Sequence, residues 1–176
     1  SGLIAVGVED ECAWTPPVSL AAQIPNATSG WGTILCDTYV NGNLVSTNTC
    51  AFQLTVPASI VPSISNVAFS EATSGVADRF GGYVRTRSKL SVSITAAGAQ
   101  GSSISAYRTS IDNVTYSGSS FTTNTLNTAG NLALTVTVTD SRGRTASTTR
   151  TVTVLDYSPP SLSQFTAERC NADGTA

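Results

Sequence analysis

Apolar and polar residues alternate along three stretches of the chain. Valine, leucine or isoleucine occupies every second position in 90–94, in 132–138 and again in 152–154. A period of two residues with one apolar face is typical of antiparallel strands that bury one side against a core. No stretch keeps a 3.6-residue period over ten positions, so the pattern predicts very little helix. We therefore expect an all-β protein.

The sequence also repeats itself. The stretch 55–71, TVPASIVPSISNVAFSE, aligns with 153–169, TVLDYSPPSLSQFTAER, at an offset of 98 residues (153 − 55), and 30–43 aligns more loosely with 130–144. A period of this length is about the size of one immunoglobulin-like sandwich. The predicted fold class is thus all-β, with immunoglobulin-like antiparallel β-sandwich repeats in tandem.

The repeat predicts how the chain is divided into modules. The expected parts are 1–56 as the C-terminal part of a truncated immunoglobulin-like domain, 57–61 as a linker, 62–156 as a complete immunoglobulin-like β-sandwich, and 157–176 as a linker with the first strand of a following immunoglobulin-like domain. Prolines in both linkers would make the junctions short and stiff. The predicted core of the complete sandwich consists of Leu90, Val92, Leu132, Leu134, Val136, Val152 and Val154.

Composition narrows the chemistry. Only 11% of the 176 residues are charged, the formal net charge is −2, and the chain contains no histidine and no methionine. The commonest general base and metal ligand is therefore missing. Since no nucleophile–base pair can be named either, we expect a protein that is not an enzyme and has no cofactor and no metal site. Net negative charge gives no support for nucleic-acid binding, and no apolar run has the length needed for membrane insertion.

The cysteines and one acidic cluster say little about function. Cys12, Cys36, Cys50 and Cys170 show no C-x-x-C spacing, and we interpret them as small buried thiols in strands. A disulfide between Cys36 and Cys50 across a hairpin stays open. The acidic cluster, Glu9 to Glu11, lacks the spacing of a calcium-binding loop and is interpreted as a solvated turn.

Charged residues gather in the stretch 136–154, VTVTDSRGRTASTTRTVTV. Asp140, Arg142 and Arg144 surround Gly143 between two alternating strands, at the repeat position that also holds Asn41-Gly42. Asn-Gly is a strong hairpin signal, and Asp140 can accept backbone N–H bonds at the entrance of a turn. We therefore interpret this stretch as a solvated hairpin turn, with both arginines flanking an exposed tip.

Two groups of residues are weak candidates for binding. Arg79, Arg85, Arg87 and Lys89, called the basic cluster below, would project largely from one face of a strand. We interpret the cluster as a solvated face that discourages edge-to-edge aggregation, with contact to an anionic host polymer or to a neighbouring tail protein as the alternatives. Trp14 and Trp31 could stack on sugars, although packing in a core or at a domain junction is the favoured interpretation.

A family resemblance adds to this picture. Three stretches carry it: 14–43, which begins WTPPVSLAAQ, 80–126, which begins FGGYVRTRSK, and 135–176, which begins TVTVTDSRGR. In this order they resemble minor structural proteins of long-tailed bacteriophages, which are tail components built of serial immunoglobulin-like modules. The resemblance implies a non-enzymatic protein of the virion tail near host attachment. It assigns no role to any individual residue.

Other interpretations use the same architecture. The implied partners are other tail proteins, copies of the same chain and host cell-surface polysaccharide. A bacterial surface adhesin or stalk is one alternative, and a carbohydrate-binding module attached to a hydrolase is another. Thr-rich, charge-poor sandwiches joined at proline-containing linkers suit a stiff spacer, both in a phage tail protein and in a bacterial adhesin or stalk.

Overall fold

The computed structural model describes residues 2–8, 11–167 and 169–175. The prediction of an all-β chain is confirmed, since the structure is predominantly β with antiparallel sheets. Its elements are, in chain order, η1 (Val18–Gln23), β1 (Ser29–Val40), β2 (Asn43–Thr55), β3 (Ser63–Glu71), α1 (Val76–Phe80), β4 (Tyr83–Val84), β5 (Leu90–Ala97), β6 (Ile104–Ile111), β7 (Val114–Ser117), β8 (Ser120–Thr122), β9 (Gly130–Asp140) and β10 (Thr145–Leu155).

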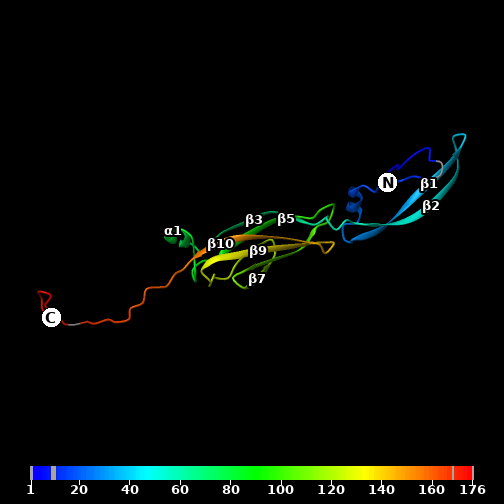
Figure 1. The fold of residues 1–176 in the computed structure, drawn as a ribbon. Helices are drawn as coiled ribbons and strands as arrows, with labels where there is room; N and C mark the ends of the chain where they lie inside the picture. The colour runs from blue at the N-terminus through cyan, green and yellow to red at the C-terminus, as the bar shows by residue number, and fades with distance from the viewer. Residues whose placement is uncertain (1, 9–10, 168, 176) are drawn as a thin grey trace.

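The molecule is elongated (Figure 1). The β1–β2 hairpin lies at one end, strands β3 to β10 form the middle, and the chain beyond Leu155 leads away from the other end. In the middle part, a five-stranded sheet has the order β4-β10-β9-β6-β7 and a three-stranded sheet the order β3-β5-β8. All strand pairs are antiparallel except β4 with β10, which are parallel.

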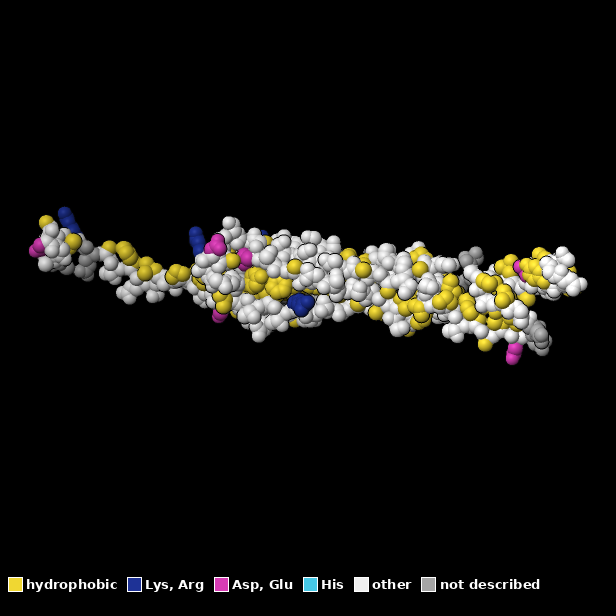
Figure 2. Space-filling view, turned by 90° about the horizontal axis from the view of Figure 1, so that it is seen from above, with side chains coloured by type: hydrophobic (Ala, Val, Ile, Leu, Met, Phe, Trp, Pro, Cys, Tyr) yellow, Lys and Arg dark blue, Asp and Glu magenta, His cyan; other side chains and the backbone are white. Residues whose placement is uncertain are grey.

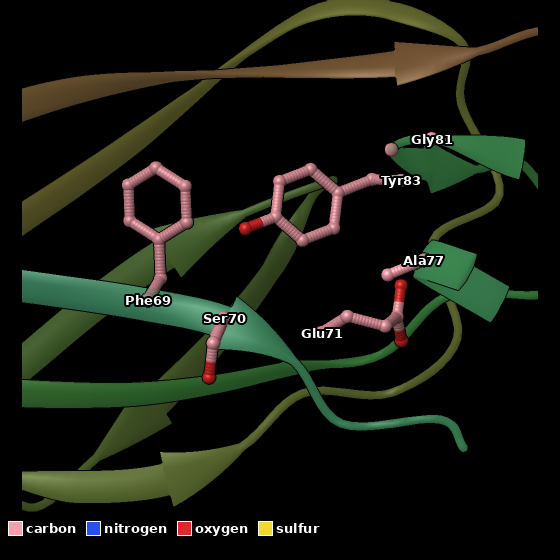
Figure 3. A pocket seen from close by; sticks show the side chains of 7 residues that line it. Phe69, Ser70, Glu71, Ala77, Gly81 and Tyr83 are labelled. Carbon is pink, nitrogen blue, oxygen red and sulfur yellow. The ribbon is translucent and has the colours of Figure 1, made fainter. Parts of the chain in front are cut away.

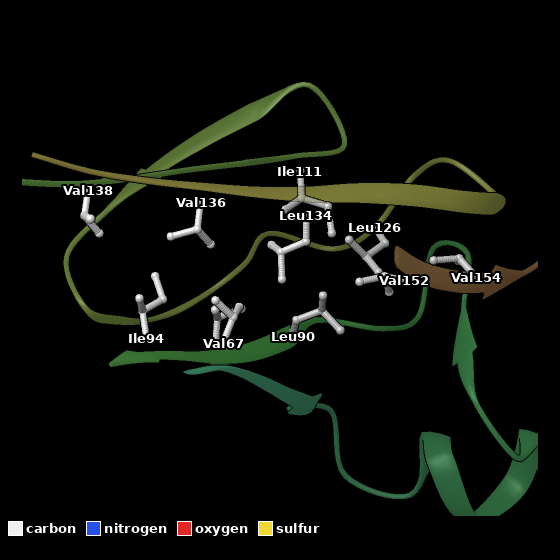
Figure 4. Close-up of a cluster of buried hydrophobic side chains, with 11 residues drawn as sticks. Val67, Leu90, Ile94, Ile111, Leu126, Leu134, Val136, Val138, Val152 and Val154 are labelled. Atoms are coloured by element: carbon white, nitrogen blue, oxygen red, sulfur yellow. The ribbon is translucent and has the colours of Figure 1, made fainter. Parts of the chain in front are cut away.

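The two sheets enclose one hydrophobic core (Figure 4). Six of the seven predicted core residues are buried, and Leu132 is partly buried against them. The alternating pattern thus identifies the inner face of β5, β9 and β10 correctly. The core also contains Ile111 and Leu126, which lie at the end of β6 and in a loop, outside any alternating stretch.

The β1–β2 hairpin turns at Asn41 and Gly42, whose φ angles of 51° and 79° are the left-handed values that the Asn-Gly pair predicts. It is a two-stranded sheet, and neither strand has a second strand partner among the described residues. Trp31, Leu35 and Tyr39 lie exposed along β1. With one sheet of two strands, the hairpin cannot enclose a core as the middle part does.

The interpretation of the cysteines as buried thiols is wrong. All four are free and exposed. Cys36 and Cys50 do lie in the hairpin, but Cys50 pairs with Ile34 and Cys36 with Asn48, so the two thiols are offset by two positions. Because no second sheet covers this hairpin, its strands leave the thiols in solvent.

Beyond Leu155 the described residues form no strand, and Leu162 and Phe165 are exposed. The expectation that this segment supplies the first strand of a following domain stays a prediction, as does the division of the chain into modules. Of the acidic cluster, Glu9 and Asp10 lie outside the described residues, and Glu11 is exposed.

Candidate functional site

The turn between β9 and β10 is built around a buried carboxylate. Asp140, at the end of β9, is 1% exposed. Its Oδ1 accepts the backbone N–H groups of Arg142 at 3.0 Å and of Arg144 at 2.8 Å. Gly143 supplies the positive φ, 79°, that closes the turn between them. This part of the prediction is correct, since the stretch is a turn organised by Asp140.

The Arg142 side chain is buried, with 7% of its surface exposed. Its guanidinium group donates to backbone carbonyls on both sides of a junction. On the hairpin side the acceptors are Ile24 at 2.9 Å and Ala21 at 2.8 Å, at the C-terminal end of η1. On the sandwich side they are Ala99 and Gln100, in the loop between β5 and β6. One side chain therefore joins two parts of the molecule.

Arg144 holds the linker in the same way. Its guanidinium donates to the carbonyl groups of Val56 at 2.6 Å and Ile60 at 2.7 Å, and also to that of Pro57. The Ser141 hydroxyl donates to the Pro25 carbonyl at 2.6 Å. We call Asp140, Ser141, Arg142 and Arg144, together with these carbonyl acceptors, the junction site.

The prediction that both arginines flank an exposed tip is therefore wrong. The physical reason is a set of carbonyl groups in η1, in the linker and in the β5–β6 loop that no strand satisfies. Arginine has five N–H donors in a planar fork and no acceptor, so it can satisfy several carbonyls at once. A signal was present in the sequence: two arginines around a glycine in a chain with few charges.

The junction site is suited to fixing the orientation of the hairpin side relative to the sandwich. The planar guanidinium group presents its donors in a fixed geometry, so each bond to a carbonyl restrains the direction of the side chain. A cation at the C-terminal end of a short helix is also favoured by the carbonyl dipoles there. The acceptors are backbone carbonyls with no leaving group, so the arrangement positions two units and offers no reacting atom.

The structure separates the basic cluster into two pairs. Arg79 lies on α1 and is exposed, as is Lys89. Arg85 and Arg87 lie in a turn that follows β4, and both contact Tyr157: Arg85 donates to its carbonyl at 3.2 Å, and the Arg87 guanidinium lies 5.3 Å from the centre of its ring. Arg85 and Arg87 therefore hold the C-terminal segment, and contact of the basic cluster with an anionic polymer stays a prediction.

The prediction that 85–89 form a strand is wrong. Thr86 has a φ of 64°, and Ser88, which is buried, closes the turn by accepting the Val84 N–H on its hydroxyl at 2.7 Å. The Ser88 N–H in turn donates to the Val84 carbonyl at 2.9 Å. Alternation of basic and small residues resembles a strand in sequence, but here the side-chain bond of Ser88 favours a turn.

The two tryptophans differ in their surroundings. Trp14 packs edge-on against Phe52, with ring centroids 5.9 Å apart. Trp31 is 75% exposed and neighbours Gly32, which is paired with Phe52, so Trp31 and Phe52 point to opposite faces of the hairpin. Trp14 therefore packs as expected, whereas Trp31 contributes to no core. They do not form a shared stacking platform.

A hollow of about 370 Å³ lies between the end of β3, α1 and β4 (Figure 3). Glu71 lines it, and its Oε1 accepts the backbone N–H groups of Thr73 at 2.8 Å and Lys89 at 3.1 Å. Burial raises the pKa of the Tyr83 phenol in the same wall, and the negative charge of Glu71 raises it further. Oε1 of the Glu71 carboxylate thus ties two loops together, while its buried Oε2 has no hydrogen-bond partner among the described residues.

Comparison with known families decides the origin of the chain. Residues 1–175 match the model of a family described as siphovirus protein of unknown function, DUF859. The chain belongs to this siphovirus family. No curated protein and no solved structure matches it. The resemblance to proteins of long-tailed phages is thereby confirmed at the level of the virus group.

Cysteine, aspartate and glutamate side chains are spread over the described part of the siphovirus protein. No three of the Cys, Asp and Glu side chains in 2–8, 11–167 and 169–175 come close enough together to hold a metal ion. In the same ranges, no helix has both the length and the apolar character needed to cross a bilayer. The junction site thus remains the most highly organised polar site that we find in the described part of the siphovirus chain.

Proposed function

We propose that this siphovirus protein is a non-enzymatic structural module of the phage tail, acting as a spacer or as a component of host-surface attachment. The observation that carries the proposal is the junction site, where the buried Arg142 binds carbonyl groups of both the hairpin side and the sandwich. A spacer needs each module to keep its orientation to the next. A buried guanidinium with four carbonyl acceptors supplies that stiffness.

We further propose that the fold is a tandem of immunoglobulin-like sandwiches. The β1–β2 hairpin occupies the repeat position of β9–β10, since 30–43 align with 130–144 and 55–56 with 153–154. In the sandwich, β6 pairs with β9 and β4 with β10. The equivalent edges of β1 and β2 are therefore the places where strands of other tail proteins, or of copies of this chain, would pair.

The first test locates the protein. An antibody raised against this chain is expected to label the tails of purified virions in electron micrographs, and the protein is expected at fixed stoichiometry in their mass spectra. Virions that lack the protein would contradict the proposal. Labelling of uninfected bacterial surfaces would instead support a bacterial adhesin or stalk.

The attachment role has a separate test. Arg79 and Lys89 are the members of the basic cluster whose side chains make no hydrogen bond, ion pair or cation–π contact with other described residues. For a spacer, the R79E/K89E variant is expected to adsorb to host cells within about two-fold of the unmodified chain at 0.05 and 0.5 M NaCl. Adsorption that falls steeply with salt and is lost in the variant would show contact with an anionic polymer, because exposed charges are screened within about 8–10 Å.

A carbohydrate-binding module is the remaining alternative. Its sugar-stacking platform would be Trp31, the more exposed tryptophan. Binding on a glycan array that disappears in W31A would favour this alternative, with W14A as the comparison, since Trp14 packs on Phe52 within the protein.

A further inference from the structure

Where the chain leaves the sandwich, Asp156 and Tyr157 make a group of contacts with it. The Leu155 carbonyl accepts the backbone N–H of Arg85 at 2.9 Å. Directly after it, Asp156 forms an ion pair with Arg85, with 3.0 Å between Oδ1 and Nε. Tyr157 packs edge-on against Phe80, with ring centroids 5.5 Å apart, and lies under the Arg87 guanidinium.

We infer that Arg85, Arg87 and Phe80 form a latch on Asp156 and Tyr157 that opens with salt, so that the protein bends at Tyr157 and stays stiff at the junction site. The inference goes beyond the proposed function and does not depend on it, because the contacts belong to the isolated chain. It gives the basic cluster a role: two of its members orient the C-terminal segment.

The two ends of the sandwich differ in how their charges are placed. At the junction site, Arg142 is 7% exposed. In the latch, the Arg85 side chain is 35% exposed and that of Asp156 is 71% exposed. Arg85 Nε is itself buried and makes no hydrogen bond of good geometry with the carboxylate, so the contact is mainly coulombic and is open to solvent on the Asp156 side. Exposed ion pairs contribute little and are screened by salt, whereas buried groups are screened much less.

The remaining latch contacts are a hydrogen bond, a cation–π contact and an aromatic pair. The Arg85 guanidinium donates to the Tyr157 carbonyl at 3.2 Å, which is long for a hydrogen bond, in a partly buried position. The cation–π contact of Arg87 is electrostatic and weakens when the cation is well solvated. Only the Phe80–Tyr157 pair is apolar, and one aromatic pair at the surface is a small restraint. Beyond Tyr157 the described chain forms no strand and extends away from the sandwich (Figures 1 and 2), so no strand pairing of the described residues restrains it there.

The test is NMR relaxation of backbone amides in the unmodified chain at 0.05 and 1 M NaCl. At low salt the order parameter of the Tyr157 amide is expected near 0.85, as in rigid backbone, and at 1 M NaCl below about 0.6. The amides of Ile24 and Ile60 at the junction site are expected to stay rigid at both salt concentrations. The R85Q/R87Q variant should show the mobile Tyr157 amide already at low salt, and K89Q, which removes a neighbouring charge that does not touch Tyr157, should not.

Two results would overturn the inference. In the first, Tyr157 stays rigid at 1 M NaCl and in R85Q/R87Q, which would mean that the Phe80 contact alone holds the segment. In the second, Ile24 or Ile60 loses order at the same salt concentration as Tyr157, which would mean that the two ends do not differ. The salt series on the unmodified chain decides the matter even where a variant folds poorly. Because the salt series measures neither binding nor presence in the virion, a result that overturns the latch leaves the tail proposal standing.

Discussion

Amide hydrogen exchange in 18–28 and 56–60 is expected to accelerate at least about ten-fold when Arg142 is replaced by methionine. The variant keeps much of the side-chain volume but removes every donor to the carbonyls of Ala21, Ile24, Ala99 and Gln100. Hydrogen bonds to a charged group contribute about 1.5–3 kcal/mol each, so losing several should open the junction. The Ile24 and Val56 amides report on it, because each donates to a carbonyl beside the junction site.

Two comparison variants separate charge from geometry. R142K keeps the charge, but a single ammonium cannot span four carbonyl groups, so it should accelerate exchange almost as much. R150M removes an exposed arginine of β10 and should leave exchange in these segments unchanged. Exchange rates in R142M equal to those of the unmodified protein would mean that Arg142 does not hold the junction.

The second large effect concerns the core. L134A is expected to lower the free energy of unfolding of the sandwich by about 2–4 kcal/mol, measured by urea denaturation, through lost burial and the cavity left behind. Leu134 is 0% exposed and lies at the centre of β9, among residues of both sheets (Figure 4). The matched control is L35A in β1, where the side chain is 64% exposed and the cost should stay within about 0.5 kcal/mol. Equal losses in both variants would contradict the assigned core.

The sequence predicts the core well because burial in a sheet leaves a local trace. Leu134 and Val136 alternate with threonines whose hydroxyl groups face solvent and bond across the strands, as Thr135 does with Thr149. That pattern is visible within ten residues of chain. The same reasoning finds the turn at Asn41 and Gly42, since only a few residue pairs adopt its backbone angles readily.

The carbonyl acceptors of the junction site leave no comparable trace. Arg142 is separated from its acceptor Ala21 by 121 residues, and the acceptors are backbone carbonyls, which every residue carries. Nothing in the identity of Ala21 or Ile24 indicates a bond to arginine. The turn of 85–88 was missed for a related reason, because the hydroxyl of Ser88 can bond locally and override an alternating pattern. Side-chain bonds to backbone therefore account for the wrong interpretations of the arginine turn and of 85–89.

The central claim is that the hairpin and the sandwich move as one body, held by the junction site. Residual dipolar couplings of backbone amides test it most directly, because they report the orientation of each unit relative to a common alignment frame. For the unmodified chain, couplings from β1–β2 and from β3–β10 are expected to fit one alignment tensor of a single magnitude. In R142M, the magnitude of the tensor fitted to the hairpin should fall relative to that of the sandwich. Two tensors of different magnitude in the unmodified chain would contradict the account.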